Sequence, residues 1–555
     1  MFVTGCGRLS ALIGQVAGRR ALWFWAAALA IVAYWLYATQ THFFVGPSEW
    51  DDVYYWENAR GQGPRWELRN RYFYIWLMRL YYLAWPENPL RAAGLFTTTV
   101  SAVTAISAAI IAFHLAGRKA ALAALVLVPS HHALLKWVSV PYVDHGIAMW
   151  ATLCIACLLS ARRLAVTDAR CGTRTVALFA LHALAGATVY FAIKTKETGL
   201  ALVPVAIAFL VLIDRRPRAW LSTLAGFLAG WCAHRGLDAL LVSGDWTWWS
   251  SDPWVYFGNN PNPAPHGHQD VRMSASYVDQ LTRPAHLAAT LACTAGIVSL
   301  YREHQAVRLM TWWIACMLAF GSFIATRWLG IFADERYLAG IAPVMVVIAV
   351  FWAIDRFRRA QPDRWTRHLL EIAIVVLICA FPLYGSIGRE MQLDGPQVRR
   401  ALFYWLPLGT LFLFVAGYLL RSRSGRAASL IALALLAAWN SHHEARKYVA
   451  SSRMRMAPWR ELAGMVDEQW IDLARHGRTY PAWRIRRRIA TYAVRDDVRV
   501  RNLKRIEDAE GYEWVIVRGS SSRTMERRNW RRMVHGVDKD GPWSAYRPPW
   551  AHESR

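Results

Sequence analysis

Charged residues interrupt a long apolar run in the middle of the chain, in the sequence VYFAIKTKETGLALVPVAIAFLVLI. Lys194, Lys196 and Glu197 join two apolar segments that are each close to membrane length. Charges in such a place are costly unless they face a cavity, a partner or the membrane interface. A single lysine can reach the interface without any functional role. Two lysines followed by a glutamate instead predict a cationic site for an anionic group at a membrane surface.

Acidic residues lie just beyond two other apolar segments. Asp51 and Asp52 stand in SEWDDVYYWENARG, and a positioned carboxylate can accept the proton of an attacking hydroxyl. Asp144 and His145 stand in KWVSVPYVDHGIAMW and form a second acidic site. Both sets have a simpler interpretation, because Asp is favoured at the start of a helix. His145 could also be a metal ligand, although Asp followed by His is common at helix ends.

A further cation lies later in the chain, in FADERYLAGIAPV. Arg336 and Tyr337 precede an apolar segment on the side of the membrane that we predict for Lys194 and Lys196. Arginine makes bidentate contacts to phosphate oxygens. These cations are therefore predicted to share one phosphate group.

Tryptophan is abundant, with 30 residues in the chain. Trp246, Trp248 and Trp249 cluster in GDWTWWSSDPW, where their rings could stack on a sugar. The simpler interpretation is that they anchor the chain at the membrane interface, as most of the other tryptophans would.

The segments that position these residues are predicted to be membrane helices. The chain has 555 residues, is 55% hydrophobic, and has a mean hydropathy of +0.18. Most of its apolar blocks approach the ~20 residues that a spanning helix needs, and they lack the alternation of barrel strands. We count thirteen blocks, at 22–38, 92–116, 120–135, 146–160, 176–193, 198–213, 220–242, 285–301, 309–326, 338–354, 372–388, 402–420 and 427–439. The predicted fold class is an all-α polytopic membrane protein with about thirteen transmembrane helices.

The net charge of +26 is distributed as in a membrane protein rather than a nucleic-acid-binding protein. If the N-terminus is cytoplasmic, every second short loop carries arginine or lysine, which agrees with the positive-inside rule. An odd number of spans then places the C-terminus outside. Arginine greatly outnumbers lysine and alanine is abundant, as in proteins from GC-rich bacterial genomes. The predicted location is therefore the bacterial inner membrane, with the C-terminal domain on its periplasmic or extracellular side. No nucleic acid is expected as a partner.

Two domains are predicted from this pattern. Residues 1–440 form the transmembrane module, with outer loops at about 39–91 and 243–284, and residues 441–555 form a small extracytoplasmic α/β domain. The second half of the first loop is predicted to be an amphipathic helix at the interface. In the tail, WRELAGMVDEQWIDLARHG is predicted to be helical and YEWVIVRG to be a strand. The basic surface of the tail is either a contact for anionic headgroups and glycans or a solvated surface without a partner.

The order of these motifs resembles that of the GT-C superfamily of membrane glycosyltransferases. The similarity is to the branch of protein O-mannosyltransferases and the lipid A aminoarabinose transferase, over roughly residues 20–360. It lies in DDVYYWENA, VPYVDHGIAMW, AIKTKETGLALVPVAIAF and ERYLAGIAPVMVVIA, taken in that order. The family commonly has Asp-Glu in its first loop where this chain has Asp51 and Asp52, which leaves open which of the two acts.

The resemblance implies a donor of the polyprenyl-phosphate-sugar type and an acceptor hydroxyl on a glycan, lipid or protein. The phosphate would lie near Lys194, Lys196 and Arg336, among membrane lipids, and Asp51 would act as the general base. One displacement predicts inversion at the anomeric carbon. No metal site is predicted, and a divalent cation is optional, because Lys and Arg can stabilise a monophosphate leaving group.

Other functions fit some of these features. A secondary transporter also has charged groups within membrane helices, although transporters commonly show repeats and midplane sites, and this chain shows neither pattern. A ligase or polymerase of lipid-linked glycans would use polyprenyl diphosphate donors. A non-catalytic relative would bind the lipid-linked sugar without turnover.

Overall fold

The computed structural model describes part of the chain. The described residues are 19–38, 55–56, 59, 72–86, 88–138, 140–166, 172–238, 240, 281, 284–320, 335–360, 458–459, 461–462, 472–476, 499–502, 514–518, 525–527, 529–538 and 541–547. The loop residues Asp51, Asp52, Trp246, Trp248 and Trp249 lie outside them. So do the predicted spans at 372–388, 402–420 and 427–439, and therefore the count of thirteen stays a prediction.

The chain divides into two compact units. The first comprises residues 1–44, 65–80 and 94–445, and the second comprises residues 45–64, 81–93 and 446–555. The first unit holds the cationic residues of interest and the apolar helices, apart from the helical residues within 81–93, which belong to the second unit. The second unit holds the sheet.

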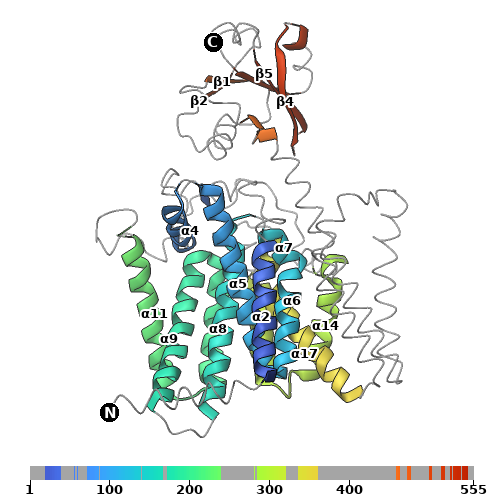
Figure 1. Ribbon diagram of the computed structural model, residues 1–555. Helices are drawn as coiled ribbons and strands as arrows, with labels where there is room; N and C mark the ends of the chain where they lie inside the picture. The colour runs from blue at the N-terminus through green and yellow to red at the C-terminus, as the bar shows by residue number, and fades with distance from the viewer. Residues whose placement is uncertain are drawn as a thin grey trace. The chain divides into compact units, whose positions relative to one another are not determined.

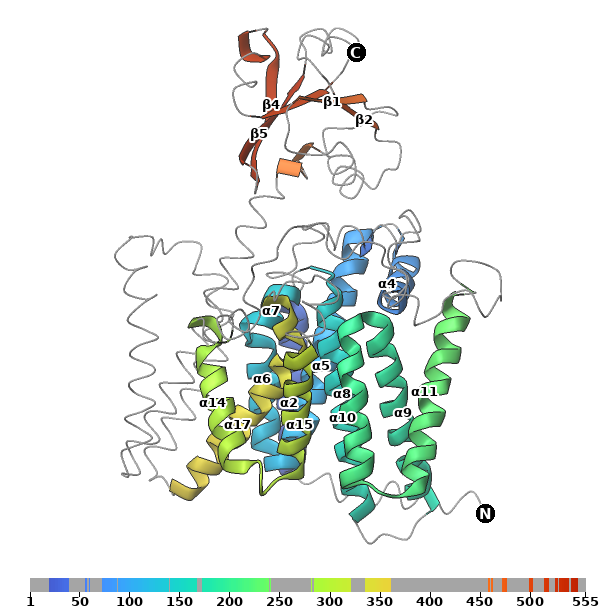
Figure 2. The same ribbon diagram turned by 180° about the vertical axis from the view of Figure 1, so that it is seen from behind.

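Helices run side by side through the first unit (Figures 1 and 2). The longer ones are α2 (Arg19–Ala38), α5 (Pro89–Ala116), α6 (Arg118–Ser130), α8 (Val143–Val166), α9 (Gly172–Thr195), α11 (Pro217–Asp238), α14 (Pro284–Leu300), α15 (Gln305–Ala319) and α17 (Ala342–Ala360). Shorter pieces are α4 (Tyr72–Ala84), α7 (His132–Val138), η2 (Glu197–Ala201), α10 (Leu202–Ala208), η3 (Phe209–Ile213) and η6 (Glu335–Gly340). The helical fold class is confirmed for these residues, and α4 confirms that the first loop contains a helix.

Three of the described helices are long and apolar enough to cross a membrane: Leu90–Ala116, Val143–Val166 and Arg174–Thr195. Shorter apolar helices cover Phe24–Tyr37, Thr198–Ile213 and Ala289–Leu300. The predicted span at 120–135 is interrupted in the structure. His131 has an extended backbone, with φ −65° and ψ 132°, which ends α6 before α7 begins.

Helices α9 and α11 pack in parallel through small residues. A Cβ at Gly186 would lie 1.9 Å from the Thr223 carbonyl oxygen, and one at Gly226 would lie 1.8 Å from that of Ala183. Such close approach of two backbones is the usual mode of packing of membrane helices through glycine. This packing holds the C-terminal ends of α9 and α11 beside each other. The end of α9 carries Lys194, and the end of α11 carries the titratable His234.

The second unit contains a five-stranded sheet with strand order β2-β1-β3-β5-β4. The strands are β1 (Asp472–His476), β2 (Arg499–Asn502), β3 (Trp514–Arg518), β4 (Arg531–Asp538) and β5 (Gly541–Arg547). β1 pairs in parallel with β2 and β3, whereas β5 pairs antiparallel with β3 and β4. The strand prediction for YEWVIVRG is confirmed by β3. The helix prediction is wrong at 472–476, because pairing with two strands distant in sequence overrides the local pattern.

Candidate active site

Asp144 of the second predicted acidic site and Lys196 of the predicted cationic site meet at one end of the helical unit. Lys196 Nζ donates a hydrogen bond to Asp144 Oδ1 at 2.7 Å, and both side chains are almost fully buried. Asp144 lies in the first turn of α8, and Lys196 follows the last residue of α9. Burial of either charge alone would be strongly destabilising, so each residue stabilises the other in its place. The sequence predicted the two residues separately, and the structure joins them.

A sharp change of backbone direction places Lys196 at this point. Its φ of −165° and ψ of 150° end the helical geometry of α9, and η2 begins at the next residue. η2 then turns back onto α9. A Cβ at Gly199 would lie 2.2 Å from the Ala192 carbonyl oxygen, so this close return requires glycine.

Aromatic side chains support the α8 and α9 ends. Trp150 donates from Nε1 to Thr195 Oγ1 at 2.9 Å, which ties α8 to the last residue of α9. Phe73 of α4 stacks on Phe191 of α9, with ring centroids 4.0 Å apart. A Cβ at Gly146 would lie 2.6 Å from the ring of Tyr74, so glycine lets this ring pass across the first turn of α8.

Lys194 is also buried and lies in the last turn of α9. The neighbouring end of α11 contributes His234, which is buried and shares a hydrogen bond of 2.9 Å between its Nδ1 and the Tyr190 hydroxyl. Sequence reasoning identified Lys194 but missed His234, Tyr190 and Trp150. The α9–α11 register brings His234 to the site, and a lone His in an apolar segment gives no indication of that register.

The segment with Arg336 and Tyr337 forms the 3₁₀ helix η6, which packs against α8. Trp313 Nε1 donates to the Gly340 carbonyl oxygen at 2.9 Å, and a Cβ at Gly340 would lie 3.4 Å from Ile147. η6 is therefore adjacent to the first two turns of α8. The side chains of Arg336 and Tyr337 lie outside the described residues, so their role in phosphate binding stays a prediction.

Among the described residues, no group of three or more His, Cys, Asp or Glu side chains is arranged to hold a metal ion. Asp51 and Asp52 are not part of that set. Among the described residues, the ends of α8, α9 and α11 that meet here carry two buried lysines, the carboxylate of Asp144 and the imidazoles of His145 and His234. Such a set can bind an anion and orient hydroxyl groups.

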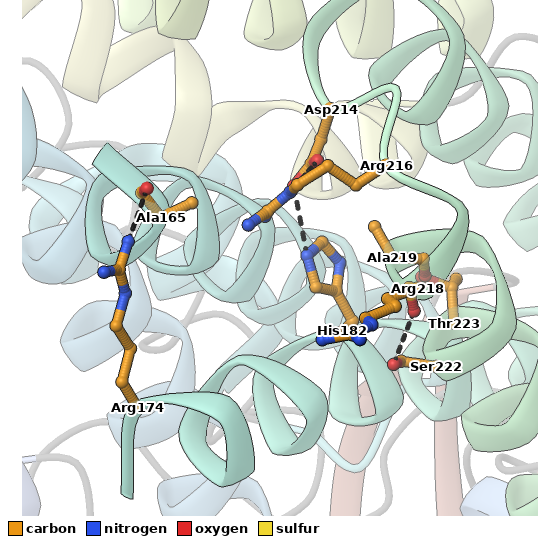
Figure 3. Close-up of polar contacts among 9 residues, drawn as sticks. All are labelled: Ala165, Arg174, His182, Asp214, Arg216, Arg218, Ala219, Ser222 and Thr223. Atoms are coloured by element: carbon orange, nitrogen blue, oxygen red, sulfur yellow. Dashed lines mark hydrogen bonds and ion pairs between the residues drawn. The ribbon is translucent and has the colours of Figure 1, made fainter. Parts of the chain in front are cut away.

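A second ion cluster, which the sequence did not indicate, lies toward the opposite end of the helical unit, where the middle of α9 faces the turn before α11 (Figure 3). Asp214, in the turn before α11, accepts hydrogen bonds from Arg216 Nε at 2.7 Å and from Nη2 at 2.6 Å. His182 Nε2 of α9 lies 3.2 Å from Asp214 Oδ2. Burial alone would raise the pKa of the Asp214 carboxyl, but hydrogen bonds from Arg216 and His182 outweigh it and hold the pKa below its usual range.

Arginines gather at this second end. Arg174 Nη2 donates to the Ala165 carbonyl oxygen at 2.6 Å, and Arg358 Nη2 donates to that of Ala116 at 3.0 Å. The loops concerned are among those predicted to be basic and cytoplasmic. The Arg174 bond spans the loop between α8 and α9, and the Arg358 bond joins the end of α17 to the end of α5. Arg163 Nη1 lies 3.2 Å from His114 Nδ1 and links the ends of α8 and α5, so these basic segments gather at the helix ends opposite Lys196.

Comparison with known proteins identifies the fold. No protein-family model and no curated protein sequence matches the chain. Among solved structures, it is similar to ArnT from Cupriavidus metallidurans bound to undecaprenyl phosphate, with a TM-score of 0.55 at 14% identity over 96% of this chain and 98% of that one. The chain shares the fold of this ArnT structure.

The archaeal oligosaccharyltransferase AglB from Archaeoglobus fulgidus, in complex with an inhibitory peptide and a dolichol-phosphate, aligns less well. Its TM-score is 0.46 at 12% identity, over 90% of this chain and 69% of that one. The resemblance inferred from the order of the sequence motifs is thus confirmed at the level of the fold.

Proposed function

We propose that the chain is an integral membrane glycosyltransferase that moves a sugar from a polyprenyl-phosphate-sugar donor to an acceptor hydroxyl at the outer face of the membrane. The observation that carries the proposal is the buried Asp144–Lys196 pair beside Lys194, at the end of the helical unit opposite the basic loops. The GT-C fold supports it, because the similar ArnT structure is bound to undecaprenyl phosphate.

The two lysines bind the phosphate of the donor. Lys196 is oriented by Asp144, so its ammonium stays at the junction of α8 and α9 and does not turn toward the interface. Lys194 brings a second positive charge within the same turn of chain. Arg336 and Tyr337 extend this set from η6, which packs on α8. The polyprenyl chain lies in lipid beside the helices.

The reaction is a single displacement. The acceptor hydroxyl oxygen attacks the anomeric carbon while its proton passes to the carboxylate of Asp51, or of Asp52. The bond from the anomeric carbon to the phosphate oxygen breaks, and the electron pair stays on the polyprenyl phosphate. The lysines stabilise the charge that grows on this leaving group. One displacement inverts the anomeric configuration.

The remaining predicted residues have accessory roles in this proposal. Trp246, Trp248 and Trp249 stack on the sugar or the acceptor, and the C-terminal domain faces the periplasm or the exterior of the cell. The acceptor is a glycan, a lipid or a protein. A divalent cation is not required for departure of a monophosphate, although the acidic first loop could hold one.

The test of the catalytic step uses Asp51→Asn and Asp52→Asn with transfer and donor binding measured separately. Removal of the general base should lower turnover by about 10²–10⁴-fold while donor affinity stays near that of the wild type. Comparison of the two variants identifies the base. Full turnover in both variants would refute the assignment, and transport of the lipid-linked sugar without transfer would favour a transporter instead.

A further inference from the structure

The first turn of α8 and the neighbouring η2 carry buried polar atoms that have no hydrogen-bond partner among the described residues. These atoms are Asp144 Oδ2, both ring nitrogens of His145, and Thr198 Oγ1. The three residues are at most 2% exposed. Buried polar atoms in folded proteins are nearly always paired, so a group of unpaired ones indicates a functional site.

These atoms belong to one place in the fold. Asp144 and His145 are consecutive, and the other carboxylate oxygen of Asp144 accepts a hydrogen bond from Lys196 at 2.7 Å. Thr198 follows Lys196 by two residues, on η2, which contacts both α8 and α9. The group therefore lies where the start of α8 meets η2 and the end of α9, the same helix ends that carry the proposed phosphate-binding lysines.

The hydrogen-bonding character of the group differs from that of the lysines. A carboxylate oxygen accepts, a neutral imidazole donates from one nitrogen and accepts at the other, and a threonine hydroxyl does both. Phosphate oxygens only accept in their ionised state, so a carboxylate disfavours them. Hydroxyl groups both donate and accept, and therefore match this mixed set.

We propose that Asp144 Oδ2, His145 and Thr198 bind hydroxyl groups of the donor's sugar, and that His145 and Thr198 determine specificity for a hydroxylated sugar. This inference rests on the proposed function, because it needs a donor phosphate at Lys194 and Lys196. The site then has two parts. The lysines bind the phosphate, and the first turn of α8 with η2 binds the sugar attached to it.

The experiment compares the binding of undecaprenyl phosphate and of undecaprenyl phosphate-glucose to the full-length protein in detergent, by native mass spectrometry. Thr198→Val and His145→Phe should each weaken binding of the glucosylated lipid about tenfold, as expected for one lost hydrogen bond to a buried polar group. Binding of undecaprenyl phosphate should change less than twofold. His145→Gln, which keeps a donor and an acceptor, should restore part of the affinity.

Thr198→Val separates this role from a structural one. Valine has nearly the shape of threonine, and the hydroxyl that it removes has no partner among the described residues, so the melting temperature should not fall. Thr311→Val is the matched control, since Thr311 Oγ1 bonds to the Val307 carbonyl oxygen within α15. It should leave the binding of both lipids unchanged.

Two results are distinguishable. An unchanged ratio of the two affinities in Thr198→Val and His145→Phe would overturn the sugar-binding inference and leave the phosphate site in place. If the wild type bound neither lipid, the proposed function itself would fail, and the sugar-binding inference with it.

Discussion

At the scale of single residues, the site depends on a pair of opposite charges that are 52 positions apart in sequence. Asp144 and Lys196 were each recognisable from sequence as charges at the edges of apolar segments. Their pairing was not, because the sequence does not fix how the end of α9 meets the start of α8. His234 was missed for the same reason.

Lys196→Met should leave Asp144 as an unpaired buried carboxylate and lower stability by about 3–5 kcal/mol. The double variant Asp144→Asn with Lys196→Met removes both charges and should recover much of that loss, but not the transfer activity. Thermal unfolding in detergent, read together with activity, tests the pair. Additive losses of stability in the double variant would show that the two residues do not stabilise each other.

At the scale of elements, the turn from α9 into η2 depends on the close backbone approach at Gly199 as well as on the ion pair of Lys196 with Asp144. The sequence analysis placed Gly199 inside the predicted span 198–213, and its close approach to Ala192 could not be predicted, because it depends on how η2 folds back. The wrong helix prediction at 472–476 has a related cause. Strand β1 is stabilised by parallel partners, β2 and β3, that lie later in the sequence.

Gly199→Ala should displace η2 from α9, because the added Cβ would overlap the Ala192 carbonyl oxygen. We expect a lower melting temperature and a large loss of activity, since Lys196 moves with the turn. Gly236→Ala is the matched control in α11, where a Cβ meets nothing within 4 Å. Equal behaviour of the two variants in thermal unfolding and transfer would contradict this account of the turn.

The Asp214 cluster joins α9 to the turn before α11 at the basic end (Figure 3). Folding lowers the pKa of the Asp214 carboxyl, so the ionised carboxylate stabilises the fold fully at pH values above the pKa of an unfolded Asp, near 4. This contribution is lost as the pH falls from there through the lower pKa of the folded state. Asp214→Asn should therefore lower stability by about 2 kcal/mol at pH 7. The difference in melting temperature from the wild type should shrink as the pH is lowered below 4.

At the scale of the whole molecule, the helical fold class could be predicted, because apolar blocks and basic loops follow directly from the requirements of a bilayer. The resemblance to GT-C enzymes came from the order of short motifs, and the similarity to ArnT confirms that fold. The hydrogen-bonding groups around Lys196 became evident only in three dimensions. They depend on which polar atoms remain unpaired after α8, α9 and η2 have packed.

The central claim is that the buried lysines hold the phosphate of a polyprenyl-linked donor. The most direct measurement is mass spectrometry of lipids that co-purify with the wild type, with Lys194→Ala, and with Lys119→Ala, an exposed lysine at the start of α6. A polyprenyl phosphate, free or glycosylated, should accompany the wild type and Lys119→Ala and be lost from Lys194→Ala. Ordinary phospholipids alone, identical in all three proteins, would contradict the claim.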